Sequence, residues 1–264
     1  MKEKFIKSTF ILLIGGFFTK ILGMIIKIVM SRMIGTEGLG LYMLILPTFS
    51  LFIGLSQFGM PIALSKHIAE DKKNNKNLFF SILLVVICVN LLLIFIIILS
   101  APFLAVRLLH NSGAYLGILA IALVIPFTSI SSICRSYFFG KERMAPHVIS
   151  NILEDIVRLF LMVIGIPFFR SKGINYAVCY IVLSNIISEG ISILVLFLFL
   201  PKHVVFKRSD LVPNRDYIRD SLSIGIPNTT GRLIGSVGYF LEPIILTFVL
   251  LKCGYSSEYI TTEY

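Results

Sequence analysis

Three stretches of this sequence, residues 38–65, 78–106 and 108–134, contain no Asp, Glu, Lys or Arg. Each exceeds the roughly 20 apolar residues that a helix needs to cross the hydrocarbon core of a bilayer. Lipid offers no partners for exposed backbone N–H and C=O groups, so runs of this kind must be helical when they lie in a membrane. The chain is therefore predicted to be an all-α bundle that crosses a membrane several times.

The composition of the whole chain supports the same class. Of 264 residues, 56% are hydrophobic and 14% are charged, and the mean hydropathy is +0.91. One water-soluble core cannot bury this much apolar surface. Charged residues and segments rich in Gly or Pro divide the chain into seven predicted spans: residues 8–34, 39–65, 78–106, 115–138, 147–169, 174–200 and 218–251.

Basic residues are unevenly distributed between the two ends of these spans. Fifteen lie on the side of the N-terminus: Lys2, Lys4, Lys7, Lys66, Lys72, Lys73, Lys76, Arg135, Lys141, Arg143, Lys202, Lys207, Arg208, Arg215 and Arg219. Five lie on the other side: Arg32, Arg107, Arg170, Lys172 and Lys252. Because cytoplasmic loops carry the excess of Lys and Arg, we expect a cell-membrane protein with a cytoplasmic N-terminus.

Several function classes have no support in the sequence. The formal net charge of +10 does not indicate nucleic-acid binding, because the basic residues lie in short loops between apolar runs. No GxxxxGK[ST], HExxH or GxSxG motif occurs, so we expect neither an enzyme nor a cofactor. The four cysteines have no metal-binding spacing, and no metal site is expected.

The chain resembles itself at an offset of 212 residues. Residues 5–7 align with 217–219, and residues 20–23 align with 232–235, so that Lys20 matches Arg232. Six spans separate the copies, so both begin on the same side of the membrane, as in parallel two-lobed transporters. We predict a six-helix lobe over residues 1–200, a basic cytoplasmic linker over 201–216 and the start of a C-terminally incomplete second lobe over 217–264.

Basic residues inside the predicted spans are candidate functional residues, because a charge at the bilayer centre costs roughly 2.5 to 3.5 kcal/mol on insertion scales. Lys20 and Lys27 are seven residues apart, so they share one helical face at a separation of about 10 Å. We expect them to line a cavity, and snorkelling of Lys27 toward the outer interface is the alternative. Arg232, which follows a polar segment at 228–230, is also expected in a cavity.

Acidic residues inside the spans form a second candidate group. Glu154 and Arg158 have the i, i+4 spacing of an ion pair, and Asp155 lies beside them. A structural pair and a substrate or ion site both fit this spacing. Glu189 and Glu242 are predicted either to neutralise buried cations or to carry coupling protons.

Several motifs resemble one family of membrane proteins. They are GGF at 15–17, TKILG at 19–23, SRMIG at 31–35, EGLGLY at 37–42, RSYFFG at 135–140 with the later Glu154 and Arg158, GIP at 225–227 and GRLI at 231–234. Across nearly the whole chain, these segments are similar to the stage V sporulation protein B family of polysaccharide-type transporters.

The resemblance implies a MATE-like fold of the multidrug/oligosaccharidyl-lipid/polysaccharide (MOP) exporter superfamily, with two six-helix lobes and alternating access. MurJ-type lipid II flippases are relatives, in which cavity cations engage the pyrophosphate of a lipid-linked sugar. The matching positions are Lys20, Lys27 and Arg232, and Arg158 is a further substrate-binding candidate. The family leads us to expect arginine at the first two positions, and lysine keeps the charge but loses bidentate phosphate contact.

Three functions are compatible with these features. The leading prediction is a flippase for an undecaprenyl-pyrophosphate-linked glycan, a peptidoglycan precursor for spore cortex synthesis. Its partners would be the lipid bilayer and cell-wall synthesis proteins. The alternatives are a cation-coupled drug or small-molecule antiporter of the same fold, although residues 8–34 contain no acidic residue, and a non-transporting scaffold of a cell-wall complex, which has no need of intramembrane charges.

Overall fold

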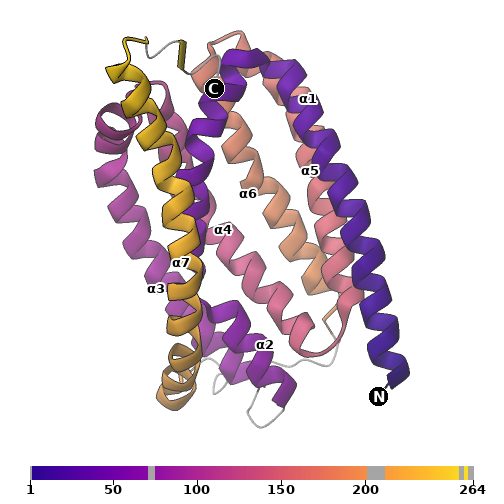
Figure 1. Cartoon of the computed structure of the whole chain (residues 1–264). Coiled ribbons are helices and arrows are strands. Elements are labelled where there is room, and N and C mark those ends of the chain that lie inside the picture. The colour runs from indigo at the N-terminus through magenta and orange to yellow at the C-terminus, as the bar shows by residue number, and fades with distance from the viewer. Residues whose placement is uncertain (1, 71–74, 201–211, 256–258, 261–264) are drawn as a thin grey trace.

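The computed structural model describes residues 2–70, 75–200, 212–255 and 259–260, which form helices joined by short turns, with no strand among them (Figure 1). The all-α prediction is confirmed. Most of the predicted linker 201–216 lies outside the described residues. Five of the basic residues used to predict orientation also lie outside them: Lys72, Lys73, Lys202, Lys207 and Arg208.

The first helix, α1 (Lys2–Gln57), consists of two arms that are separated at Gly35. Gly35 has φ 73° and ψ −176°, a conformation that only a residue without Cβ adopts at low cost. The N-terminal arm runs from the N-terminus to the opposite end of the molecule, and the second arm returns from there (Figure 1). The two arms correspond to the predicted spans 8–34 and 39–65.

The predicted span 39–65 is wrong at its C-terminal end. α1 ends at Gln57, and a separate helix, α2 (Met60–Glu70), follows. Phe58 and Gly59 have φ 47° and 62°, in the left-handed region, which interrupts a right-handed helix. α2 lies at the end of the molecule that holds the N-terminus, so it makes no further crossing (Figure 1).

The remaining helices run alternately between the two ends of the molecule (Figure 1). They are α3 (Asn75–Pro102) with the π-helical turn η1 (Phe103–Leu108), α4 (Ala114–Gly140), α5 (Met144–Arg170), α6 (Ile174–Leu198) and α7 (Arg215–Lys252). With the two arms of α1, the described chain therefore passes between the two ends at the seven predicted places.

Most of these helical segments are long and apolar enough to cross a membrane. Five meet that description: Ser8–Glu70, which holds both arms of α1, Asn75–Leu108, Ala114–Gly140, Ile174–Leu198 and Arg215–Lys252. α5 has 27 residues, but Glu154, Asp155 and Arg158 interrupt its apolar sequence. On α3, Phe95 is 65% exposed whereas Asn90 is 1% exposed, an inside-out distribution that suits lipid as the solvent. These features support the predicted multi-pass membrane protein.

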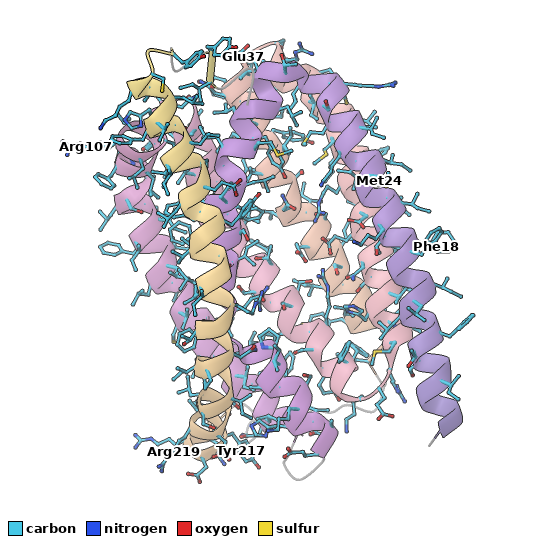
Figure 2. The ribbon with its side chains drawn as sticks, viewed as in Figure 1. Phe18, Met24, Glu37, Arg107, Tyr217 and Arg219 are labelled. Carbon is cyan, nitrogen blue, oxygen red and sulfur yellow. The ribbon has the colours of Figure 1, made fainter. Side chains whose placement is uncertain are left out.

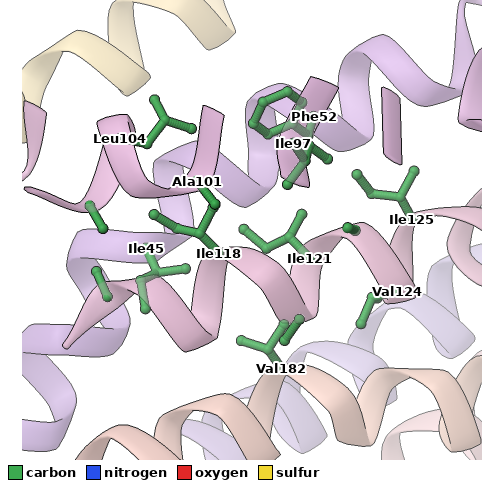
Figure 3. Packing of buried hydrophobic residues seen from close by; sticks show 14 of the residues in the cluster. Ile45, Phe52, Ile97, Ala101, Leu104, Ile118, Ile121, Val124, Ile125 and Val182 are labelled. Carbon is green, nitrogen blue, oxygen red and sulfur yellow. The ribbon is translucent and has the colours of Figure 1, made fainter. Parts of the chain in front are cut away.

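The largest apolar core surrounds α4 (Figure 3). Ile118, Ile121 and Ile125 of α4 are fully buried. Their neighbours in the cluster are Ile45 and Phe52 of α1, Ile97 and Ala101 of α3, Leu104 of η1 and Val182 of α6. Helices α1, α3 and α6 and the turn η1 therefore pack on α4, which lies at the centre of this core.

A buried polar cluster joins α1, α3 and α4 near this core. The Ser129 hydroxyl donates to the Ser56 hydroxyl at 2.9 Å, and Asn90 Oδ1 lies 3.3 Å from the same Ser129 oxygen. The Asn90 amide donates to the Val86 carbonyl at 2.6 Å and to the Ser56 carbonyl at 3.4 Å. Because lipid provides no hydrogen-bond partner, these mutual contacts hold the three helices together.

The seventh helix packs against α1, α2 and α3. The Asn214 side chain caps its first turn by accepting from the Asp216 N–H at 2.9 Å, so α7 begins at Arg215, three residues before the predicted span 218–251. A Cβ on Gly59 would lie 2.3 Å from the Gly225 carbonyl oxygen, which shows how closely α7 approaches the break after α1.

α7 and the N-terminal arm of α1 run in the same direction. Tyr217 and Arg219, at the start of α7, lie at the end of the molecule that holds the N-terminus, and Glu37, just beyond the first arm, lies at the opposite end (Figure 2). This is the relative direction that the 212-residue repeat requires.

Candidate functional site

A buried ion-pair network joins α4, α5 and α6. Arg135 of α4 donates through Nη2 to the carboxylate of Glu154 on α5 and, at 2.7 Å, to that of Glu189 on α6. The same nitrogen lies 3.0 Å from the Ser192 hydroxyl. The Glu154 and Glu189 side chains are 8% exposed, so one guanidinium connects two carboxylates inside the lobe.

Arg158 extends the network along α5. Its Nη2 donates to the second oxygen of Glu154, and its Nη1 lies 3.3 Å from Asp155 Oδ1. The predicted i, i+4 pair of Glu154 and Arg158 is confirmed. Glu154 thus uses one carboxylate oxygen for each arginine.

The position of Arg135 corrects the sequence analysis, which placed it in a cytoplasmic loop and did not include it among the site residues. It lies inside α4, five residues before the helix ends at Gly140. Its partners are 19 and 54 residues away in sequence, so no helical spacing reveals them. The available signal was the predicted span 115–138, which already contained this arginine. Without Arg135, the charge asymmetry between the two ends keeps its direction.

The network holds three carboxylates and two guanidinium groups. It is therefore electrically neutral only when it binds one proton or one monovalent cation. The Nε atoms of Arg135 and Arg158 are buried and have no hydrogen-bond partner among the described residues. Removing either arginine leaves buried carboxylates uncompensated, at a cost of about 3 to 5 kcal/mol.

Lys20 and Lys27 lie apart from this network. Both side chains are exposed on the N-terminal arm of α1, and the continuous helix places them on one face, as predicted. Other positions form the seam with α5: a Cβ on Gly15 would lie 2.3 Å from a Val148 methyl group. Within the described ranges, neither lysine forms a salt bridge.

Arg232 and Glu242 are exposed on α7. Arg232 Nη1 lies 3.5 Å from Gln57 Oε1, at the end of the second arm of α1. Glu242 lines a cavity of about 650 Å³ between that arm and α7. Glu189, which was grouped with Glu242 in the prediction, instead pairs with Arg135. No salt bridge to Arg232 or Glu242 occurs in the part of the chain that the structure describes.

The two exposed cations Lys20 and Arg232 lie at similar depth. Lys20 is 18 residues after the start of α1, about 27 Å along the helix, and Arg232 is 17 residues after the start of α7, about 26 Å along it, and both helices start at the same end of the molecule. Each residue therefore lies near the middle of a helix that is longer than the roughly 30 Å hydrocarbon core.

Comparison with known proteins identifies the family. A family model described as "Polysaccharide biosynthesis protein" matches residues 5–251. The chain belongs to this family. It is 34% identical over 279 aligned residues to stage V sporulation protein B of Bacillus subtilis (strain 168). This alignment covers 100% of this chain and 53% of the relative. The resemblance predicted from the sequence motifs is confirmed.

A second relative and a solved structure extend the comparison. The chain is 27% identical over 216 residues to lipid II flippase MurJ of Bacillus subtilis (strain 168), covering 75% of this chain and 40% of the relative. The fold is similar to the inward-facing conformation of a multidrug resistance MATE family transporter of the MOP superfamily. The TM-score is 0.67 at 17% identity, covering 88% of this chain and 53% of that chain. The predicted MATE-like fold is confirmed, and the chain spans about half the length of the relatives it matches.

Proposed function

We propose that this chain is the N-terminal part of an alternating-access transporter that flips a lipid-linked anionic glycan across the cell membrane. Membership of the polysaccharide biosynthesis protein family and the likeness to a protein named as a lipid II flippase support this proposal. The substrate would be an undecaprenyl-pyrophosphate-linked glycan, a peptidoglycan precursor for spore cortex synthesis. Cell-wall synthesis proteins would supply and receive it.

The observation that carries the proposal is the contrast between two groups of intramembrane cations. Arg135 and Arg158 are neutralised by carboxylates inside the lobe. Lys20, Lys27 and Arg232 are exposed and have no salt bridge among the described residues. A charge facing lipid at this depth is costly, so an anionic ligand in a cavity between two lobes would explain why these charges stay unpaired.

The proposed architecture follows the repeat. Residues 1–200 form the first lobe and residues 217–264 begin the second, which would place Lys20 and Arg232 on opposite walls of one cavity. A diphosphate held between them would exchange its hydration for lysine and arginine contacts, while the lipid tail stays in the bilayer. The excess of Lys and Arg at the N-terminal side supports a cytoplasmic N-terminus, so that substrate would enter from the cytoplasmic leaflet.

A cation-coupled antiporter of the same fold is the second candidate. Glu242 favours it, because an exposed carboxylate lines the cavity between α1 and α7. In the flippase, by contrast, Glu242 and the excess carboxylate of the Glu154, Asp155 and Glu189 network would bind the coupling ion.

Binding of a polyprenyl-diphosphate glycan separates these candidates. In native mass spectrometry of the longer protein that carries both lobes, Lys20→Gln and Arg232→Gln should each weaken binding by about tenfold, the loss expected for one charge-assisted contact. Arg32→Gln removes an exposed charge from the same arm of α1 near its turn and should leave binding unchanged. Equal binding by all three variants would contradict the cationic site, and preferred binding of an organic cation would favour the antiporter.

A further inference from the structure

A polar stripe on α5 leads from one end of the lobe into the ion-pair network. His147, Asn151 and Glu154 have the spacing i, i+4 and i+7, so they lie on one face of this helix. Glu154 belongs to the network, whereas His147 is in the first turn of α5. At 1.5 Å per residue, the histidine lies about 10 Å from the carboxylate along the helix. Two or three water molecules would span this separation.

Buried polar atoms along this stripe lack a protein partner. His147 Nδ1 and Asn151 Oδ1 are buried and form no hydrogen bond with any described residue. The same holds for the Nε atoms of Arg135 and Arg158 at the inner end of the stripe. Because leaving buried polar atoms unpaired is costly, ordered water normally bonds to such atoms in folded proteins. The four atoms therefore indicate a line of hydration sites between His147 and the network.

A cavity of about 400 Å³ lies at the outer end of the stripe. The first turns of α1, α2 and the turn between α4 and α5 surround it, at the end of the molecule that holds the N-terminus (Figure 1). Ser8, Lys66 and Glu142 line it, so it offers polar partners to water. Phe139 forms part of its wall and packs edge-to-face on His147, with ring centroids 6.2 Å apart. The half-buried imidazole thus lies between this cavity and the buried part of the stripe.

The charged groups around this stripe belong to the network itself. Arg135 of α4 and Glu154 of α5 are the charges that act on His147. On α1, Tyr42 is a titratable group that faces the network, where it lies near Arg158. With three carboxylates and two guanidinium groups, the network keeps one negative charge, which a proton arriving along the stripe would neutralise.

The geometry favours a proton over a metal cation. Glu154 and Glu189 each direct an oxygen at the same nitrogen, Nη2 of Arg135, rather than at a shared site for a cation. Within the described ranges, no group of three His, Cys, Asp or Glu side chains is arranged to bind a metal ion. A proton needs one carboxylate oxygen and no such set of ligands.

We propose that His147 transfers protons between the cavity and the carboxylates of Glu154 and Glu189, and that Asn151 orders the water between them. The proposal rests on the proposed function, in which the network binds the coupling ion, and it identifies that ion as a proton. One ring nitrogen of His147 takes a proton from water in the cavity, and the other releases its own proton to the water beside Asn151. A carboxylate oxygen then binds this proton, and His147 ends neutral in its other tautomer.

Time-resolved infrared spectroscopy measures this transfer in the longer protein that carries both lobes, in detergent and without glycan. After a jump to lower pH, the absorption of a protonated carboxyl group should appear, and Glu189→Gln should diminish it. His147→Ala should slow its appearance by about a hundredfold, the lower end of what a positioned proton-transfer group contributes. Added imidazole should restore the rate, because it replaces the missing ring. Asn151→Leu should also slow the transfer, without rescue by imidazole, and tests the route if His147→Ala disturbs the fold.

His110→Ala is the matched control, because His110 is exposed in the turn before α4, at the opposite end of the molecule. It should leave the rate unchanged. A wild-type rate in His147→Ala would overturn the proposal, as would a slow rate that imidazole does not restore, since that result would indicate a structural role. Absence of a protonated carboxyl signal would also overturn it, and a Na⁺-dependent signal in its place would assign a metal cation to the network. Glycan binding is measured separately, so failure of this proposal leaves the proposed function standing.

Discussion

Arg135 Nη2 lies 2.7 Å from a carboxylate oxygen of Glu189, and this contact links α4 to α6 inside the lobe. Neutralising Arg135 alone should leave Glu154 and Glu189 without their shared guanidinium, at a cost of about 3 to 5 kcal/mol, whereas neutralising Glu189 alone should cost less, because Arg135 keeps its contact with Glu154. The double variant Arg135→Met with Glu189→Met should therefore cost less than the sum of the two single variants. Thermal melting of the detergent-solubilised protein, followed by size-exclusion chromatography, measures the difference.

Asp155→Asn serves as the control for this cycle. Asp155 belongs to the same network, but its side chain is 17% exposed, and among the described residues it forms one salt bridge, to Arg158 at 3.3 Å. Its neutralisation should lower the melting temperature less than either single variant above. Strict additivity of Arg135→Met and Glu189→Met would show that the two residues are not coupled.

Close packing between α5 and α6 leads us to predict that a larger residue at Gly165 destabilises the protein. A Cβ on Gly165 would lie 2.1 Å from Tyr180 Cζ, and this ring is fixed by stacking on Phe169 at 4.6 Å and by a 2.8 Å hydrogen bond from its hydroxyl to the Leu161 carbonyl. Gly165→Ala should therefore destabilise the protein by about 1 to 3 kcal/mol, the cost of overpacking.

Gly190 offers the matched comparison for this substitution. It lies inside α6, and nothing would lie within 4 Å of an added Cβ. Gly190→Ala should leave the melting temperature unchanged or raise it, because alanine favours a helix by about 1 kcal/mol over glycine. An equal loss of stability in both alanine variants would refute a specific clash with Tyr180.

The sequence predicted the passes between the two ends well, because length and hydropathy alone determine which segments suit a membrane. The predicted C-terminal end of the second span, residue 65, was wrong, because the helix breaks at Phe58 and Gly59. These residues have positive φ at the place where α7 packs against the chain. The local pair of Glu154 and Arg158 was readable from its spacing. Arg135 and Glu189 are 54 residues apart, and only the packing of α4 against α6 brings them together.

Orientation in the membrane is a further prediction. Glu142, between α4 and α5, and Ser171, between α5 and α6, are both exposed and lie in turns at opposite ends of α5. In a background without Cys88 and Cys253, which are exposed, Glu142→Cys should react with an impermeant maleimide only from the cytoplasm and Ser171→Cys only from outside. The reverse labelling pattern would overturn the cytoplasmic N-terminus.

The central claim is that Lys20, Lys27 and Arg232 bind the diphosphate of a lipid-linked glycan within the membrane while it is flipped. It is tested most directly in cells whose only flippase is the longer protein carrying both lobes, by the accessibility of the lipid-linked glycan to an externally added impermeant enzyme. Lys20→Gln and Arg232→Gln should abolish accessibility at equal protein level, Lys27→Gln should reduce it less, and Lys20→Arg should retain it because the charge is kept. Wild-type accessibility in the Lys20→Gln and Arg232→Gln variants would contradict the cationic-cavity mechanism.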